Sequence, residues 1–219
     1  MRNLIRNNTV TTDDWALATL PALPEEAVRK QAGKVVVFKL TGESAATPEQ
    51  IAGTTILPGK AIIPLTVWLE RKDTLSARVA AGEIGVWLET FEPVEDLVGS
   101  LPDLNTLPLI AVHFPRFADG RGFSIATLLR NRYGYRNEIR AVGDVLRDQL
   151  FYMKRCGFDA FAIREDRSAE DALASLRDFS EPYQGAVDNP LPVWRRYTRH
   201  AHQPFAERKY QPAHEDEVD

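Results

Sequence analysis

The residues whose types could do chemistry lie in two short turns. The first turn reads Asp119-Gly120-Arg121-Gly122 and follows an apolar run. Glycines before a helix leave backbone N–H groups accessible, and with an arginine beside them these groups can hold an anion. The helix is expected to begin near Ser124, so capping by Asp119 or Ser124 is the alternative role for this turn. Gly120, Arg121 and Gly122 are therefore candidate ligand-binding residues, and Asp119 is a candidate acid or base.

A second turn has a similar composition. Gly143 permits the turn, Asp144 is expected to be the N-cap of the next helix, and Arg147 lies on its first helical turn. A carboxylate and an arginine beside a sheet edge can do acid–base work on a bound group. Asp144 is the second candidate catalytic residue, and Arg147 is a further candidate ligand-binding residue.

Two more arginines belong to the predicted site. Arg140 lies inside the strand E-I-R-A-V, which is expected to be covered on both faces, and Arg164 follows a later strand. A buried arginine needs a carboxylate or a bound anion, because an unpaired buried charge is very costly. We expect Asp144 or Asp119 to be the partner of Arg140. An internal arginine–aspartate lock that joins two loops is the alternative to a ligand site.

Neither turn matches a standard phosphate-binding motif. The first turn has Ile125 where the dinucleotide-binding motif needs a third small residue, and no Gly-Lys-Ser/Thr sequence follows it. The residues therefore predict an anion site without identifying a reaction.

Short strands that alternate with helices must position these turns. A helix is expected to begin at Pro64 and to end before Gly82. The alternation after it predicts right-handed βαβ units, and hence an α/β fold with a mostly parallel sheet of four or five strands, either an open sheet or a half-barrel. Ligands of such sheets bind at the carboxyl ends of the strands, where both turns lie. The expected strands are 84–88, 107–114, 138–142 and 158–163, and the helices after them are 93–98, 124–133, 145–156 and 168–179.

The chain divides into three parts. Residues 1–60 are expected to form a small β-rich segment packed on the main domain, with a hairpin around Asn7-Asn8 and a strand at 34–40. Residues 61–180 form the α/β domain. Residues 181–219 are expected to be an extended arm with a disordered tip. Three of the four histidines lie in this arm without carboxylate support, so we expect no metal site.

Composition and charge exclude several classes of protein. The chain of 219 residues has a net charge of −4, yet residues 113–164 hold ten basic residues against five acidic ones. A local positive excess on an acidic protein argues against nonspecific binding of nucleic acid and fits a small anion or a patch on a partner. The sequence has no run of about 18 apolar residues and no apolar core of a secretory signal, so we expect a cytoplasmic protein without membrane segments.

The single cysteine restricts the chemistry further. Cys156 cannot form an intrachain disulfide, and one thiolate cannot hold a cysteine-ligated iron–sulfur cluster, which usually needs four. It ends an apolar helical face, so we expect a buried structural thiol.

Several motifs together resemble one bacterial family. They are F-P-R-F-A-D-G-R-G-F-S, R-N-R-Y-G-Y, E-I-R-A-V-G-D-V-L-R-D-Q-L-F-Y-M-K-R-C-G-F-D-A-F and D-F-S-E-P-Y-Q, with I-R-N-N and D-D-W near the start. The chain is similar over residues 1–192 to the domain-of-unknown-function family nine-three-four, which is described as an oxidoreductase involved in sulfite reduction. Where this chain has His113, the family more often carries an acidic residue, so His113 receives no catalytic role from the resemblance.

The resemblance implies a role in sulfur assimilation, because genes of the family lie beside those of assimilatory sulfite reductase. Sulfite reductase needs siroheme and an iron–sulfur cluster, so we expect an accessory protein that binds a small oxyanion at the sheet edge, with the identity of any cofactor left open. The partner would be sulfite reductase or another protein of sulfur assimilation. The alternative is a noncatalytic protein that holds such a partner through its basic region and its C-terminal arm.

Overall fold

The computed structural model of the protein describes residues 3–21 and 46–196. The strand expected at 34–40 and the C-terminal tip, with its three histidines, lie outside the described residues.

The strands form one sheet, whose order is β2-β1-β8-β7-β6-β5-β4-β3. The strands β3 to β8 lie in chain order, and each is parallel to the next. The hairpin of β1 and β2 adds two antiparallel strands beside β8. The bounds of the strands are β1 Leu4–Arg6, β2 Thr9–Thr11, β3 Ala16–Leu17, β4 Ala61–Pro64, β5 Ile84–Glu89, β6 Leu109–Phe114, β7 Glu138–Gly143 and β8 Ala160–Ala162.

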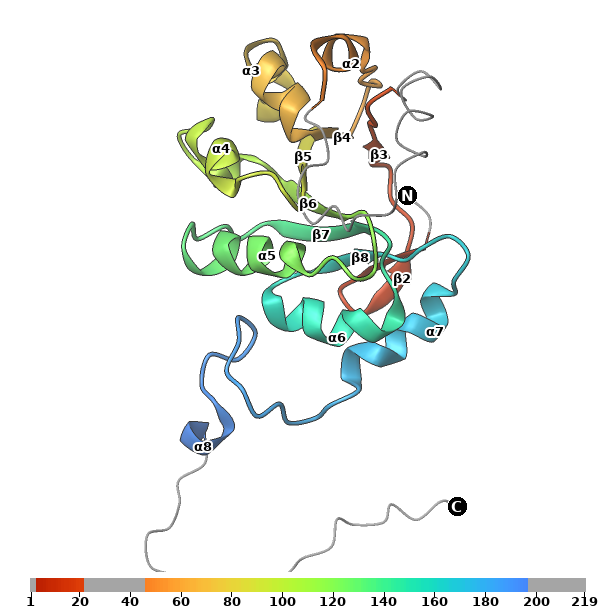
Figure 1. Cartoon of the computed structure of the whole chain (residues 1–219), viewed down its shortest axis with the longest axis vertical. Helices are drawn as coiled ribbons and strands as arrows, with labels where there is room; N and C mark the ends of the chain where they lie inside the picture. Colours follow the sequence, from red (N-terminus) through yellow and green to blue (C-terminus); the bar gives the residue numbers. More distant parts are fainter. Residues whose placement is uncertain (1–2, 22–45, 197–219) are drawn as a thin grey trace, which may run out of the picture.

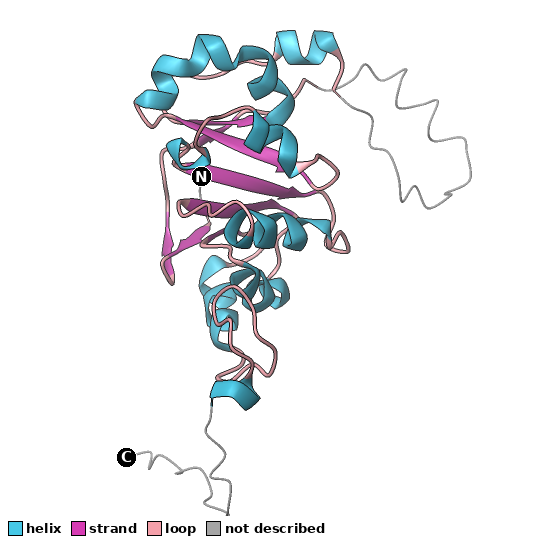
Figure 2. Cartoon of the chain, turned by 90° about the vertical axis from the view of Figure 1, so that its left-hand side faces the viewer, coloured by secondary structure: helices cyan, strands magenta, loops and turns pink. Residues whose placement is uncertain are grey.

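The helices that connect the parallel strands lie on one face of the sheet (Figure 1). A right-handed crossover between adjacent parallel strands always returns on the same side, so strands in chain order collect their helices on one face. Figure 2 views the molecule from the side that carries these helices. The bounds of these helices are α2 Pro48–Gly53, α3 Leu65–Ala80, α4 Val94–Gly99, η1 Leu104–Thr106, α5 Arg121–Asn131 and α6 Arg147–Cys156. After β8, the last strand, follow α7 Ala169–Leu173, η2 Ala174–Arg177 and α8 Val193–Arg196.

The sheet is curled into an open half-barrel. The consecutive strands β2 and β3 occupy its opposite edges, yet only residues 12–15 join them. Five peptide steps span at most about 18 Å, whereas a flat sheet of eight strands would separate its edges by about 33 Å. The connecting segment can make this crossing only because the edges bend toward each other.

The two faces of the sheet bury different residues. The helix-covered face forms the large core, with Val86, Ile110, Val112 and Phe114 among its members. The concave face holds a smaller cluster in which Trp15, from the crossing segment, packs with residues of the strands: Ile62, Trp87, Leu109, Ala111 and Val142. Side chains alternate between these faces along each strand, so the concave face is where polar strand residues meet the crossing segment.

The expected fold class is confirmed in its main features and extended in its size. The sheet is mostly parallel and forms a half-barrel, but it has eight strands instead of four or five. Two of the extra strands were missed because β3 and β4 have only two and four residues. The hairpin around Asn7 and Asn8 is present, and both residues have positive φ. It extends the sheet itself, because β1 pairs with β8.

The described part of the chain ends in a segment that leads away from the sheet and carries α8 (Figure 1). Arg155 on α6 anchors its beginning, because its guanidinium donates to the carbonyl of Gln184 and its carbonyl accepts from Val187. No described helix is long and apolar enough to cross a membrane.

Candidate functional site

Glu89 and His113 form a carboxylate–imidazole pair at the carboxyl edge of the sheet. They are register partners at the ends of the adjacent strands β5 and β6. Nδ1 of His113 lies 3.1 Å from Oε1 and 3.0 Å from Oε2 of Glu89. The imidazole also meets the indole of Trp87 edge-on, with ring centroids 5.2 Å apart. The carboxylate and the indole together fix the orientation of the imidazole.

The second ring nitrogen of His113 lies against Gly143. A Cβ at this glycine would lie 2.4 Å from the carbonyl oxygen of Phe114, 2.7 Å from Cδ2 of His113 and 3.0 Å from its Nε2. The φ of Gly143 is +96°, a conformation that favours glycine. Within residues 3–21 and 46–196, no hydrogen bond engages Nε2. The His113 side chain is 29% exposed, so the imidazole is partly open to solvent at the edge.

A cavity of about 350 Å³ adjoins Glu89 on the side away from His113. Its lining includes Thr66, Trp87, Phe91 and Glu92. Oε2 of Glu92 accepts a 2.7 Å hydrogen bond from the backbone N–H of Glu89. Burial, with a smaller contribution from the charges of Glu89 and Asp96, raises the pKa of Glu92 to about 7, although this hydrogen bond acts to lower it. Glu92 can therefore gain and lose a proton near neutral pH.

Asp119 and Arg121 form a second group at the same edge. Oδ1 of Asp119 accepts from Nε and the backbone N–H of Arg121, and Oδ2 accepts from Nη2 of Arg121 and the hydroxyl of Thr90. These bonds, above all those from the Arg121 guanidinium, hold the pKa of Asp119 well below its usual range. The first turn is thus tied together by its own carboxylate, which carries its charge at neutral pH.

The helix after this turn begins earlier than expected. Helix α5 begins at Arg121 with Gly120 as its N-cap, so Ser124 lies within the helix instead of capping it. Gly122 is buried against β6, where a Cβ would lie 2.6 Å from Cζ of Phe114. The two glycines therefore have different roles: Gly120 is exposed in the turn, and Gly122 allows α5 to approach the sheet.

Asp144 and Arg164 form the third group. Nη1 of Arg164 lies 2.7 Å from Oδ1 of Asp144, and its Nε lies 2.6 Å from Oδ1 of Asp166. Both carboxylates raise the pKa of Arg164 above its ordinary value, the Asp166 contribution being the larger. Oδ2 of Asp144 accepts from the backbone N–H of Phe117, which ties this loop to the first turn.

Asp144 is not the N-cap of α6, which corrects the sequence prediction. The helix begins at Arg147, and Oε1 of Gln149 accepts from the backbone N–H of Leu146. Asp144 is drawn away by Arg164 and by the Phe117 amide, whose hydrogen bonds replace the expected cap. Arg147 is exposed at the start of α6.

Arg140 lies away from these loops, inside the concave face. It is fully buried as expected, but it binds the carboxylates of Asp13 at 2.6 Å and Glu138 at 2.7 Å, not those of Asp144 or Asp119. Side chains alternate between the two faces along a strand, and that of Arg140 points into the half-barrel. It therefore does not reach the edge loops. The expectation of a carboxylate partner is confirmed, and the expected identity of that partner is wrong.

The structure therefore brings most of the predicted residues to one edge, in separate groups. Asp119 with Arg121, Asp144 with Arg164, and Arg147 lie on neighbouring loops there, whereas Arg140 does not. The pair of Glu89 and His113 was missed as a unit. The only signal for this pair in the sequence was a polar residue at the end of each of two apolar strands.

Comparison with protein-family models matches residues 85–194 to the family described as "Bacterial protein of unknown function (DUF934)". The matched region runs from β5 into α8 and contains all the edge loops described above. No curated protein and no solved structure matches the chain.

Proposed function

Because the chain belongs to the family of bacterial proteins of unknown function DUF934, we propose that it is an accessory protein of assimilatory sulfite reduction that binds a small oxyanion at the carboxyl edge of its sheet. The assignment to this pathway rests on the resemblance of the whole motif set to this family. The choice of the binding site rests on the geometry of the edge. The chain has one cysteine, too few for a cysteine-ligated cluster of its own, which supports an accessory role over that of the reductase.

The pair of Glu89 and His113 carries the proposal. A carboxylate that holds one ring nitrogen of a histidine leaves the other free to exchange a proton with a ligand, as in acid–base catalysis. Nδ1 of His113 lies 3.0 Å from Oε2 of Glu89, and Nε2 forms no hydrogen bond within the described residues. In this proposal His113 takes up or delivers the proton of a bound oxyanion, and Glu89 keeps the imidazole in place.

The positive charge for an anion would come from arginines at the edge. Arg116 and Arg147 are exposed on the two loops that flank His113 and Gly143, and no ion pair of either occurs within the described residues. Arg121 and Arg164 already bind carboxylates, so they would have to exchange Asp119 or Asp144 for the ligand. Asp119 and Asp144, the acid–base residues expected from the sequence, then act as anchors of these arginines.

Growth of a deletion strain tests the pathway and the site together. We expect the strain to grow on cysteine and to fail on sulfate and on sulfite as sole sulfur source. The wild-type gene should restore growth, whereas His113→Asn and Glu89→Gln should not, with both variants folded and expressed at the normal level. Arg136→Ala, a change at an exposed residue at the opposite end of the sheet, is the control and should restore growth. Normal growth of the deletion strain on all three sources would remove the assignment to sulfur metabolism.

The noncatalytic alternative is favoured by one observation. Apolar side chains of Phe179, Tyr183, Leu191 and Trp194 are exposed on the C-terminal segment, where Tyr183 and Trp194 lie ring to ring at 4.9 Å. Exposed aromatic side chains are common at protein interfaces. If His113→Asn complements the deletion and a Tyr183→Ala, Trp194→Ala double variant does not, the protein acts by holding a partner.

A further inference from the structure

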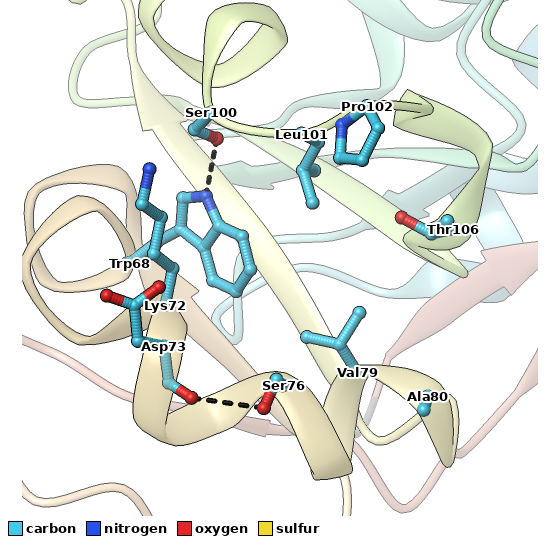
Figure 3. Close-up of a pocket in the computed structure, with 10 residues that line it drawn as sticks. All are labelled: Trp68, Lys72, Asp73, Ser76, Val79, Ala80, Ser100, Leu101, Pro102 and Thr106. Atoms are coloured by element: carbon cyan, nitrogen blue, oxygen red, sulfur yellow. Dashed lines mark hydrogen bonds between the residues drawn. The ribbon is translucent and has the colours of Figure 1, made fainter.

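A groove of about 690 Å³ lies on the helix-covered side of the sheet, between α3 and the segment from Ser100 to Thr106 (Figure 3). Helix α3 has 16 residues, but the neighbouring α4 has only six. The short helix cannot cover the length of α3, so the groove remains beside it. The sheet separates this groove from the concave face toward which Glu89 and His113 point, so it is distinct from the edge site.

The floor of the groove includes a small exposed part of a rigid indole. Trp68 is 2% exposed, and its Nε1 donates a 2.8 Å hydrogen bond to Oγ of Ser100. That hydroxyl in turn donates to the carbonyl of Leu97 at 2.7 Å. Figure 3 shows the six-membered ring of Trp68 facing the space between Leu101 and Val79. An apolar surface that is already fixed loses little conformational entropy when the apolar body of a ligand packs against it.

The polar groups around this floor are mostly hydrogen-bond acceptors. Oγ of Ser76 donates to the carbonyl of Asp73 at 3.0 Å, and Oγ1 of Thr106 donates to the carbonyl of Asp103 at 2.8 Å. Each hydroxyl has used its hydrogen and keeps lone pairs for a ligand. A molecule that fits between them therefore benefits from an N–H or O–H group on its edge.

Lys72 determines the charge of the ligand. Its side chain runs beside the indole, with the ammonium at the rim of the groove (Figure 3). No carboxylate of the described residues forms an ion pair with it. Asp73 also lines the rim, but it is exposed whereas Lys72 is half-buried, so water screens the carboxylate more than the ammonium.

We propose that this groove binds a small organic anion, with its apolar body between Val79 and Leu101, an acidic group at Lys72 and a donor toward Ser76 or Thr106. The volume is that of a typical small-molecule site, mostly apolar with a few placed polar groups. This site does not depend on the function proposed for the carboxyl edge.

Two fluorescent dyes test the proposal on the full-length protein. The anionic dye is 8-anilinonaphthalene-1-sulfonate, and the neutral dye of similar shape is N-phenyl-1-naphthylamine. We expect both to bind with saturation at one site. Lys72→Met should weaken binding of the anionic dye by about fivefold and leave the affinity for the neutral dye unchanged. An equal effect on both dyes, or on neither, would overturn the assignment of an anion.

A matched pair of tryptophan substitutions locates the site. Ser76→Trp places an indole in the groove and should lower the affinity for both dyes at least tenfold. Thr74→Trp adds the same side chain at an exposed position of α3 that does not line the groove, and should bind like the wild type. Ala80→Trp, at the other end of the groove, blocks it independently if Ser76→Trp does not fold. Dye binding that survives both blocking substitutions, or that is lost in Trp194→Ala, would place the dyes elsewhere and overturn the proposal.

Discussion

Arg140 and Asp13 meet inside the half-barrel, with 2.6 Å between Nη2 and Oδ2, although they are 127 positions apart in the chain. The two side chains are 0% and 4% exposed. Glu138 binds the same guanidinium through Nε at 2.7 Å, and Arg6 of β1 lies 3.5 Å from Glu138. These ion pairs connect the crossing segment to β7 and β1, so they hold the sheet in its curled form.

Removal of the Asp13 charge should destabilise the protein strongly. Asp13→Asn leaves a buried guanidinium with less compensation, which costs about 3 kcal/mol of the free energy of unfolding. The neighbouring Asp14 is exposed and pairs with Lys60 at the surface, so Asp14→Asn is the matched control and should leave the urea midpoint unchanged. Equal midpoints for the two variants would show that the buried pair does not hold the crossing segment.

The two glycines of the first turn should respond differently to alanine. Gly122→Ala drives a Cβ to within 2.6 Å of the Phe114 ring, which is fully buried between Phe123 and Phe158 and cannot yield. We expect a loss of about 2 kcal/mol. Gly120→Ala meets nothing closer than 3.8 Å and should unfold like the wild type. Thermal and urea unfolding of both variants measure the difference, and a stable Gly122→Ala protein would contradict the packing role.

Glu92 should make stability depend on pH between about 4.5 and 7. Its pKa is raised to about 7 in the folded protein from an ordinary value of 4.5, chiefly by burial. A raised pKa means that the folded state binds the proton more tightly than the unfolded state does. The stabilisation that the bound proton provides is therefore complete below pH 4.5 and is lost as the pH rises to 7. Glu92→Gln keeps an acceptor for the Glu89 amide without the charge.

The Glu92→Gln variant should therefore match the wild type near pH 4.5 and exceed it at pH 8. The full shift corresponds to about 3 kcal/mol, and a measured gain of about 1 kcal/mol or more would support it. Urea titrations at both pH values provide the measurement. The same difference between the two proteins at every pH would exclude the titration of Glu92 as its cause.

Cys156 should be unreactive in the folded protein. Its side chain is buried, as expected from the sequence, and burial raises the pKa of the thiol despite hydrogen bonds from Thr127 and Tyr152. Because the thiolate is the reactive form, the thiol reagent dithiobis(2-nitrobenzoate) should modify native protein at least a hundredfold more slowly than unfolded protein. Rapid modification at pH 7 in the absence of denaturant would show that the α6 region opens readily.

The sequence by itself determined the elements whose signals are local. The helix from Leu65 to Ala80 ends two residues before Gly82, which has a φ of +70°, and the strands from β5 to β8 lie where apolar runs predicted them. The need of Arg140 for a carboxylate could also be predicted, because burial of a lone charge is costly in any fold. Each of these conclusions depends on residues close together in the chain.

Only the tertiary structure decided which side chains meet. Asp13 reaches Arg140 because the sheet curls and the chain crosses its concave face, and no local pattern reports that crossing. Glu89 and His113 form a pair because β5 and β6 align with them in register, and a shift by one residue would turn one of them to the opposite face. Asp119 and Asp144 were visible in the sequence as charged residues at a sheet edge. The partner of Asp119 is Arg121 of the same turn, whereas the partner of Asp144 is Arg164, and only long-range packing brings their two loops side by side.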